Sequence, residues 1–191
     1  PAPRSRAALE HIISELLRRN RVTNGLVYLQ VSRGQARRDH AFPKQPITPT
    51  IVLTCKRLDH AAAETRAERG ITVITTPDQR WARCDIKTVN LLPNVLAKQA
   101  AHEAGAVEAW QVDTDGHVTE GSSTNAWIVT KAGKLVTRQA DHGILHGITR
   151  ARIFKCAQEL GLEIEERGFT PQEAYDAREA FLTSATSFVT P

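Results

Sequence analysis

The sequence predicts a mixed α/β fold in which a small N-terminal α/β domain precedes a larger mixed domain. Two observations lead to this expectation. Residues 6–20 have apolar positions at helical spacing and are followed by two strand-like runs, which together make one small unit. The rest of the chain is β-rich with interspersed helical segments. A polar, alanine-rich stretch between the two parts gives domains 1–64 and 65–191, with the boundary near residues 60–68.

The first domain opens with an amphipathic helix over residues 6–20, which ends in arginines that favour the helix dipole. Residues 24–34 begin with Asn-Gly and are mainly apolar on both faces, which predicts an inner strand. Residues 48–57 predict a second strand, and residues 58–70 a connector.

The second domain begins with residues 70–88, where two strand-like runs flank Pro77 and Asp78. Gly105 and Gly161 are expected to end two helices, because glycine adopts the left-handed conformation at helix C-termini. Turns are expected at Asp115-Gly116 and Ala132-Gly133. The expected elements are a helix over 93–105, β-rich residues 106–137, a helix over 147–161, and a short helix and a strand within 170–191.

Composition excludes several classes of function. The chain has 191 residues, 41% of them hydrophobic, which is typical of a folded globular protein. Its net charge is +4, but the densest basic stretch, residues 33–40, contains no aromatic side chains, so we expect no nucleic-acid partner. We expect no membrane association, because no apolar run could span a bilayer. The scattered Cys55, Cys84 and Cys156 indicate reduced thiols in a cytoplasmic protein.

Lys87 lies among apolar residues in the stretch "DIKTVNLLPN". Two interpretations are open. The side chain could pack its stem and extend its ammonium into water, as surface lysines commonly do. Alternatively, burial could keep the amine neutral, so that it forms a Schiff base with an aldehyde such as pyridoxal phosphate.

Glu120 lies in "VTEGSSTN", where a carboxylate precedes a glycine and four small polar residues. A carboxylate is needed at the ring nitrogen of a pyridine cofactor, since it keeps that nitrogen protonated and able to accept electrons. Taken alone, the segment is more typical of an exposed turn residue followed by a solvated loop.

The segment "HGITR" places Gly147, Ile148 and Thr149 at the expected start of a helix, where unpaired N–H groups and the helix dipole favour an anion. Thr149 could also be only the helix N-cap, an interpretation that is compatible with an anion site. Residues 183–187, "TSATS", could add further donors or simply end a strand.

Arg38 and His40 are two residues apart in "RRDHAFP", which places both on one side of an extended segment. A guanidinium beside an imidazole suits a carboxylate, although a solvated basic loop is the alternative. His142 and His146 have a spacing used by metal sites, but they lack a glutamate partner, so no metal site is expected.

Taken in order, these motifs resemble those of the class IV (fold-type IV) pyridoxal-phosphate aminotransferases, most closely the D-amino acid branch. The motifs "DIKTVNLLPN" and "VTEGSSTN" carry the resemblance to the class, and "RRDHAFP" the resemblance to the branch. The full matching segments are "VYLQVSRGQARRDHAFP", "RCDIKTVNLLPNVLAKQ", "EAGAVEAWQVDTDGHVTEGSSTNAWIV", "GILHGITR" and "EAFLTSATSFVTP", which together span nearly the whole chain. The resemblance implies a two-domain fold with a larger pseudo-barrel domain, and a homodimer whose active site lies at the subunit interface.

The resemblance also implies roles for individual residues. Lys87 corresponds to the Schiff-base lysine, which also moves the substrate proton, while Lys98 in the following helix is expected to be exposed. Glu120 corresponds to the partner of the ring nitrogen. Arg38 and His40 correspond to a carboxylate-binding pair. The cofactor-binding set is completed by Leu145 on the ring, Ile148 and Thr149 at the phosphate, and Ala185, where the family has a threonine, with Thr186 or Ser184 as substitutes.

Family members usually carry an N-terminal segment and a C-terminal segment beyond the ends of this sequence, so the small domain is expected to be incomplete. The implied reaction is transamination between a D-amino acid and a 2-oxo acid. Other class IV activities are the alternatives, namely branched-chain aminotransferase, aminodeoxychorismate lyase and R-amine transaminase. A non-catalytic fragment or binding module is the alternative from a different class of function.

Overall fold

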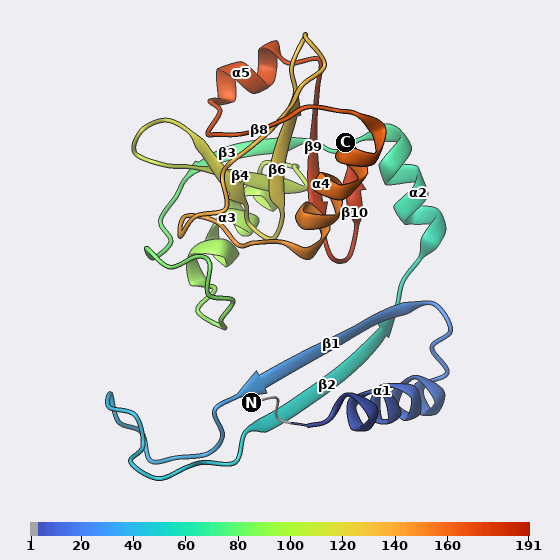
Figure 1. Ribbon diagram of the computed structural model, residues 1–191, viewed down its shortest axis with the longest axis vertical. Helices are drawn as coiled ribbons and strands as arrows, with labels where there is room; N and C mark the ends of the chain where they lie inside the picture. Colours follow the sequence, from blue (N-terminus) through green and yellow to red (C-terminus); the bar gives the residue numbers. More distant parts are fainter. Residues whose placement is uncertain (1–3) are drawn as a thin grey trace. The chain divides into compact units, whose positions relative to one another are not determined.

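The computed structural model describes residues 4–191 and divides into two compact units, which meet in sequence between His60 and Ala61 (Figure 1). Each unit combines helices with β-strands, so the mixed α/β class predicted from the sequence is confirmed. Among these residues, no helix is long and apolar enough to cross a membrane.

The first unit contains one helix and a two-stranded antiparallel sheet. Helix α1 (Arg6–Asn20) begins where the Ser5 hydroxyl accepts a hydrogen bond from the Ala8 N–H at 3.2 Å. Strand β1 (Gly25–Ser32) pairs along its whole length with β2 (Thr50–Arg57), and α1 packs against β2 (Figure 1). Both strands and the helix were predicted from the sequence.

The prediction that β1 is an inner strand is wrong for the described residues. It pairs with β2 alone, and its apolar Tyr28 and Leu29 are 51% and 40% exposed. Apolar residues on both faces show that a strand favours burial, but they do not specify which neighbours provide it. The connector expected after β2 is also more regular than predicted, because α2 (His60–Arg69) is helical, consistent with the helix propensity of its alanines.

The second unit is built on two sheets. One has three strands in the order β3-β4-β5 and the other five in the order β10-β9-β6-β7-β8. The pairs β3–β4 and β7–β8 are parallel and the other pairs antiparallel. The bounds are β3 (Val73–Pro77), β4 (Glu108–Val112), β5 (Val118–Gly121), β6 (Asn125–Val129), β7 (Leu135–Thr137), β8 (Ile164–Glu166), β9 (Glu179–Ser184) and β10 (Phe188–Thr190).

The core of this unit explains why β6 is apolar along most of its length. Ala126 and Ile128 face a cluster that includes Trp110 of β4, which joins the two sheets. Trp127, which points to the other face, packs beneath α4 (Ile148–Leu160) with Ala157. A strand covered on both faces favours uninterrupted apolar residues.

The remaining helices are α3 (Leu92–Glu103), which packs on β4, and the short α5 (Pro171–Asp176). Gly105 and Gly161 follow α3 and α4 with φ of +71° and +67°, as the sequence predicted. One strand prediction is wrong: after β3, residues 78–91 form no strand. Their apolar positions lie in an irregular segment that carries Lys87.

Candidate active site

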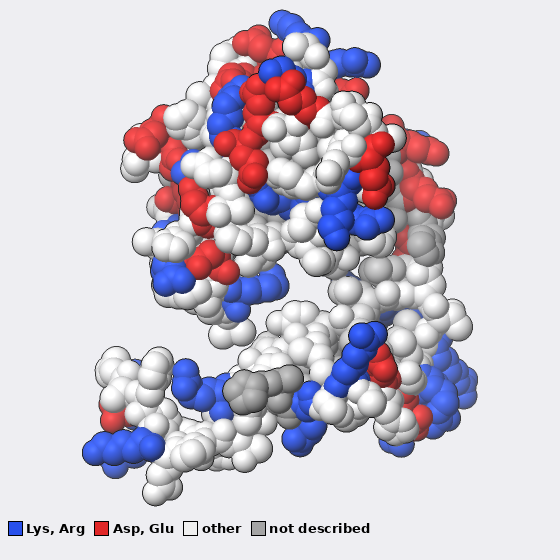
Figure 2. Space-filling model, viewed as in Figure 1, with Lys and Arg blue, Asp and Glu red and all other residues white. Residues whose placement is uncertain are grey.

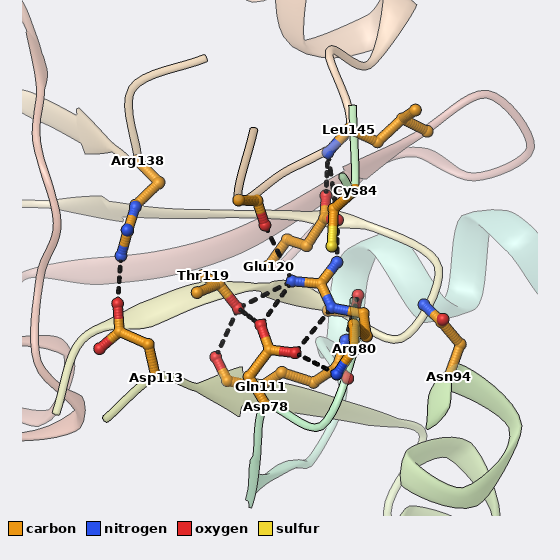
Figure 3. A network of polar contacts seen from close by, with 12 residues as sticks. Asp78, Arg80, Cys84, Asn94, Gln111, Asp113, Thr119, Glu120, Arg138 and Leu145 are labelled. Atoms are coloured by element: carbon orange, nitrogen blue, oxygen red, sulfur yellow. Dashed lines mark hydrogen bonds and ion pairs between the residues drawn. The ribbon is translucent and has the colours of Figure 1, made fainter. Parts of the chain in front are cut away.

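The site is centred on Glu120, which lies near the end of β5 and is only 6% exposed. The Leu145 N–H donates to both of its carboxylate oxygens at 3.1 Å, and the Asn125 side-chain amide donates to Oε2 at 2.9 Å. Arg80 forms an ion pair with Oε1, as Figure 3 shows. The interpretation of Glu120 as an exposed turn residue is therefore wrong.

Arg80 is itself held in place by a second carboxylate. Its side chain is 5% exposed, and it donates two hydrogen bonds to Asp78, at 2.6 and 2.9 Å (Figure 3). The same guanidinium donates to the Thr119 hydroxyl at 3.1 Å and to the Gly143 carbonyl at 3.0 Å. Arg80 thus joins the end of β3, strand β5 and the loop before α4.

Two effects in this network act in opposite directions on the pKa of Glu120. Burial raises the pKa of Glu120 to about 7, because desolvation penalises the carboxylate, while the charge and hydrogen bond of Arg80 act to lower it. Desolvation alone would also raise the pKa of Asp78, but the hydrogen bonds and charge of Arg80 outweigh it and leave that pKa lowered. Glu120 can therefore gain or lose a proton near neutral pH.

The turn after Glu120 is anchored by a further buried carboxylate, Glu108, at the start of β4. Its oxygens accept from the Ser122 N–H at 3.2 Å and from the Ser123 and Thr124 hydroxyls at 3.3 Å. Asn94 of α3 donates to the Ser122 carbonyl at 2.9 Å. The polar run "GSST" is therefore a fixed turn and not a solvated loop.

Lys87 lies in the irregular segment after Arg80, and its side chain is exposed. The Cys84 N–H of this segment donates to the His142 carbonyl at 2.8 Å, which joins it to the loop that carries Leu145. Its apolar neighbours Val89 and Leu92 are 70% and 66% exposed, so the apolar sequence around Lys87 does not bury it in this unit. The role of Lys87 remains a prediction.

Lys98, the nearby alternative amine, has a structural partner. Its Nζ donates to the Val107 carbonyl at 2.6 Å and lies 3.5 Å from Glu108 Oε1, while the side chain is 48% exposed. Its amine is therefore engaged by the Val107 carbonyl, near the Glu108 carboxylate.

The start of α4 lies close to the turn after β9. Gly147 is the N-cap of α4 and no side chain of the described residues caps the first N–H groups, so Thr149 is not an N-cap. The Thr149 hydroxyl instead donates to the Ser184 carbonyl at 2.8 Å. Ser184 Oγ accepts from the Ser187 N–H at 3.0 Å, and Ala185 and Thr186 are exposed in the same turn.

Arg38 and His40 belong to the first unit, in the irregular segment between β1 and β2, and both are exposed. The Asp39 carboxylate accepts from the His40 backbone N–H at 2.6 Å. The cofactor-binding residues predicted beside Lys87 all belong to the second unit, namely Glu120, Leu145, Ile148, Thr149, Ala185 and Thr186.

The second unit fits the cofactor that the sequence resemblance implies. Pyridoxal phosphate has a ring nitrogen that needs a carboxylate, and Glu120 is a buried carboxylate with a fixed orientation. Its phosphate needs hydrogen-bond donors, and the uncapped start of α4 offers backbone N–H groups beside the hydroxyls of the 184–187 turn.

Sequence reasoning missed four residues of this site: Asp78, Arg80, Glu108 and Asn125. The spacing of Asp78 and Arg80, opposite charges two residues apart directly after a strand, is a weak local signal of an ion pair. Their contacts with Glu120 and Thr119 join residues about forty positions apart, and no local pattern shows such contacts.

The sequence model of the family described as Amino-transferase class IV matches residues 1–191. The chain is 41% identical over 187 residues to a D-alanine aminotransferase of Bacillus licheniformis, covering 98% of this chain and 64% of that protein. It is 40% identical over 183 residues to a D-alanine aminotransferase of a Staphylococcus epidermidis strain, covering 96% of this chain and 64% of that protein.

Among solved structures, the fold is similar to that of the branched-chain amino acid aminotransferase of Escherichia coli. The TM-score is 0.82 at 25% identity, covering 100% of this chain and 64% of that one. The chain thus spans a little under two thirds of the length of these proteins. The match along its entire sequence shows that the chain belongs to the class IV aminotransferase family, whose members depend on pyridoxal phosphate.

Proposed function

We propose that the protein catalyses pyridoxal-phosphate-dependent transamination between a D-amino acid, similar to D-alanine, and a 2-oxo acid. The observation that carries this proposal is the buried Glu120, oriented by Arg80, Asn125 and the Leu145 N–H in the second unit. The D-alanine aminotransferases at 40–41% identity support the choice of substrate.

When bound, pyridoxal phosphate supplies an electron sink for the charge that develops at the substrate Cα. Glu120 places a carboxylate at the ring nitrogen, and its charge there favours a proton on that nitrogen. Arg80 supports this role because it pairs with the same carboxylate in a buried environment, where such contacts are strong.

Lys87 is proposed to attach the cofactor through Nζ and to carry a proton to and from the substrate Cα. The engagement of Lys98 with the Val107 carbonyl supports this choice between the two nearby amines. Thr149, the N–H groups at the start of α4 and the turn at Ala185 and Thr186 are proposed to hold the phosphate. Leu145 is proposed to pack on the ring.

Arg38 and His40 are proposed to bind the substrate α-carboxylate. Residues 1–60 carry eleven Lys and Arg side chains and only four Asp and Glu, and Figure 2 shows basic groups on this unit, whereas acidic groups are frequent on the other. A basic surface favours the approach of anionic 2-oxo acids and of the carboxylate end of zwitterionic amino acids.

A homodimer and a cytoplasmic location are also part of the proposal. The exposed apolar residues of the Lys87 segment and α3 support the former, because large exposed apolar patches mark protein interfaces. Three unpaired cysteines support the latter.

The proposal is tested by comparing D-alanine, L-alanine and an amine without a carboxylate as amino donors. Where the substrate α-carboxylate pairs with Arg38 away from water, losing that partner costs roughly 2–4 kcal/mol, so Arg38→Ala should lower kcat/KM for D-alanine by about two to three orders of magnitude. The rate for the amine should barely change. Arg37→Ala is the matched control, and it should leave both rates near those of the unmodified protein.

Equal rates for the two alanine enantiomers, or equal losses for D-alanine and the amine, would contradict the carboxylate pair. Such results would indicate a branched-chain, lyase or amine-specific member of the family. Failure to bind the cofactor at all would indicate a non-catalytic binding module.

A further inference from the structure

Asn125 connects the two parts of the candidate cofactor site. It is the first residue of β6 and is 5% exposed. Its side-chain nitrogen donates to Glu120 Oε2 and to the Leu145 carbonyl, both at 2.9 Å. One amide therefore binds both the Glu120 carboxylate and the loop that leads into α4.

The loop of residues 145–147, which leads into α4, is held by hydrogen bonds to both Glu120 and Asn125. The Leu145 N–H donates to Glu120, and the Leu145 carbonyl accepts from both Asn125 and the Gly147 N–H, the latter at 2.8 Å. Residues 145–147 therefore have little freedom to move relative to Glu120 while these bonds hold.

Gly147 shows that the fit between this loop and Asn125 is tight. A Cβ atom added at Gly147 would lie 2.2 Å from Asn125 Oδ1, far inside van der Waals contact. The backbone of Gly147 has φ −61° and ψ 138°, which any residue can adopt. A side chain at position 147 would therefore displace Asn125 or the loop itself, and this constraint is one of space and not of conformation.

We propose that Asn125 is a positioning residue that sets the spacing between the Glu120 carboxylate and the phosphate-binding start of α4. This inference rests on the proposed function, since it takes these two places as the sites for the ring nitrogen and the phosphate. Asparagine suits the position because its amide donates to a carboxylate and a carbonyl together, which an aspartate cannot do.

The proposal predicts that Asn125 and Gly147 are coupled in cofactor binding. Gly147→Ala should weaken pyridoxal phosphate binding by about tenfold, because the new methyl group displaces either Asn125 or the start of α4. In an Asn125→Ala background the space is open, so the same change should cost less than about twofold. The dissociation constants are measured by absorbance titration of the purified protein.

Two further variants separate the contributions of the amide. Asn125→Asp keeps an oxygen beside Gly147 but loses the donors, so Gly147→Ala should remain harmful in that background. Asn94→Ala removes another asparagine that bonds the turn after Glu120, and its effect should simply add to that of Gly147→Ala.

A spacing role is distinguished from a purely structural one by smaller ligands. Asn125→Ala should weaken pyridoxal phosphate by about tenfold, yet leave inorganic phosphate and pyridoxal, which each use one end of the site, within about twofold. A loss of folding would instead lower the melting temperature and weaken all three ligands together.

Additive effects of Asn125→Ala and Gly147→Ala, or equal losses for all three ligands, would overturn the spacing role while the proposed function stands. If the unmodified protein binds no pyridoxal phosphate, the proposed function and this inference fail together.

Discussion

Glu120 and Arg80 form a buried pair whose two members act on each other. Burial raises the pKa of Glu120 to about 7, and Arg80 opposes this rise through its charge and hydrogen bond. Asp78 also pairs with Arg80, and this second ion pair keeps the guanidinium in place beside Glu120. The proton affinity of Glu120 therefore depends strongly on one arginine.

Replacing that arginine should shift the pH dependence of the reaction. In Arg80→Gln the opposing charge is gone, so the pKa of Glu120 should rise further above 7, by about one pH unit or more. Less Glu120 is then ionised at neutral pH, and the acidic limb of kcat/KM should move to higher pH. Initial rates across a pH series measure this shift.

Arg83→Gln is the matched control, because Arg83 lies three residues away, is 46% exposed and pairs with Asp85. It should leave the profile unchanged, and Arg80→Lys should shift it less than Arg80→Gln. An unchanged acidic limb in Arg80→Gln would contradict the influence of Arg80 on Glu120.

The sequence allows Glu120 to be identified, but not its environment. Its motif is local, whereas Arg80 reaches it across forty positions and Leu145 across twenty-five. Such contacts depend on which strand ends the fold brings together. The small polar residues around Glu120 favour an exposed turn when the segment is taken alone, so its burial could not be predicted from the local sequence.

Helix α4 begins without a side-chain cap, and its first turn is tied to another element by Thr149. The Thr149 hydroxyl has one proton, which it donates to the Ser184 carbonyl and would donate to a bound phosphate instead, and Thr149→Val removes this donor. We expect pyridoxal phosphate to bind about tenfold more weakly, in line with losing a hydrogen bond to a charged group, while pyridoxal binds unchanged. Titrations with both compounds measure the difference.

Thr170→Val is the control at another helix start, because Thr170 accepts from the Glu173 N–H in a capping box of α5. It should lower the melting temperature without changing the affinity for either compound. If Thr149→Val weakened pyridoxal as much as pyridoxal phosphate, the start of α4 would not be the phosphate site.

At the level of elements, the sequence predicts best where the signal is local. The glycines after α3 and α4 and the turn glycines Gly116 and Gly133 all have positive φ, as their positions predicted. The strand expected within residues 79–88 does not form, and its apolar residues Trp81 and Ile86 are exposed instead of packing in a sheet. An alternating apolar pattern alone cannot distinguish a strand from an irregular exposed segment.

At the scale of the whole molecule, the Lys87 segment and the start of α3 expose a run of apolar residues: Ile86, Val89, Leu91, Leu92, Val95 and Leu96. If this surface is the proposed dimer interface, the unmodified protein should have a dimeric mass at micromolar concentration. Leu92→Asp should shift it to the monomer, because a charge buried at an interface lacks a partner. Light scattering after size-exclusion chromatography measures both masses.

Leu160→Asp is the control, since Leu160 at the end of α4 is also exposed, at 73%, but lies on a different helix. It should remain dimeric. A monomeric and fully active unmodified protein would rule the homodimer out.

At this scale the sequence predicted the mixed α/β class and the family, because motifs along nearly the whole chain carry both. It could not predict that β1 pairs only with β2 among the described residues, or that two sheets share one core. Strand pairing depends on long-range packing, for which a single sequence gives no direct signal.

The amine that attaches the cofactor decides whether this chain carries the proposed transamination site. Borohydride reduction of the protein with bound pyridoxal phosphate, followed by peptide mapping, should place the label on the peptide that carries Lys87. Lys98→Ala should retain the label and Lys87→Ala should lose it. A label on Lys98, or no label at all, would contradict the account.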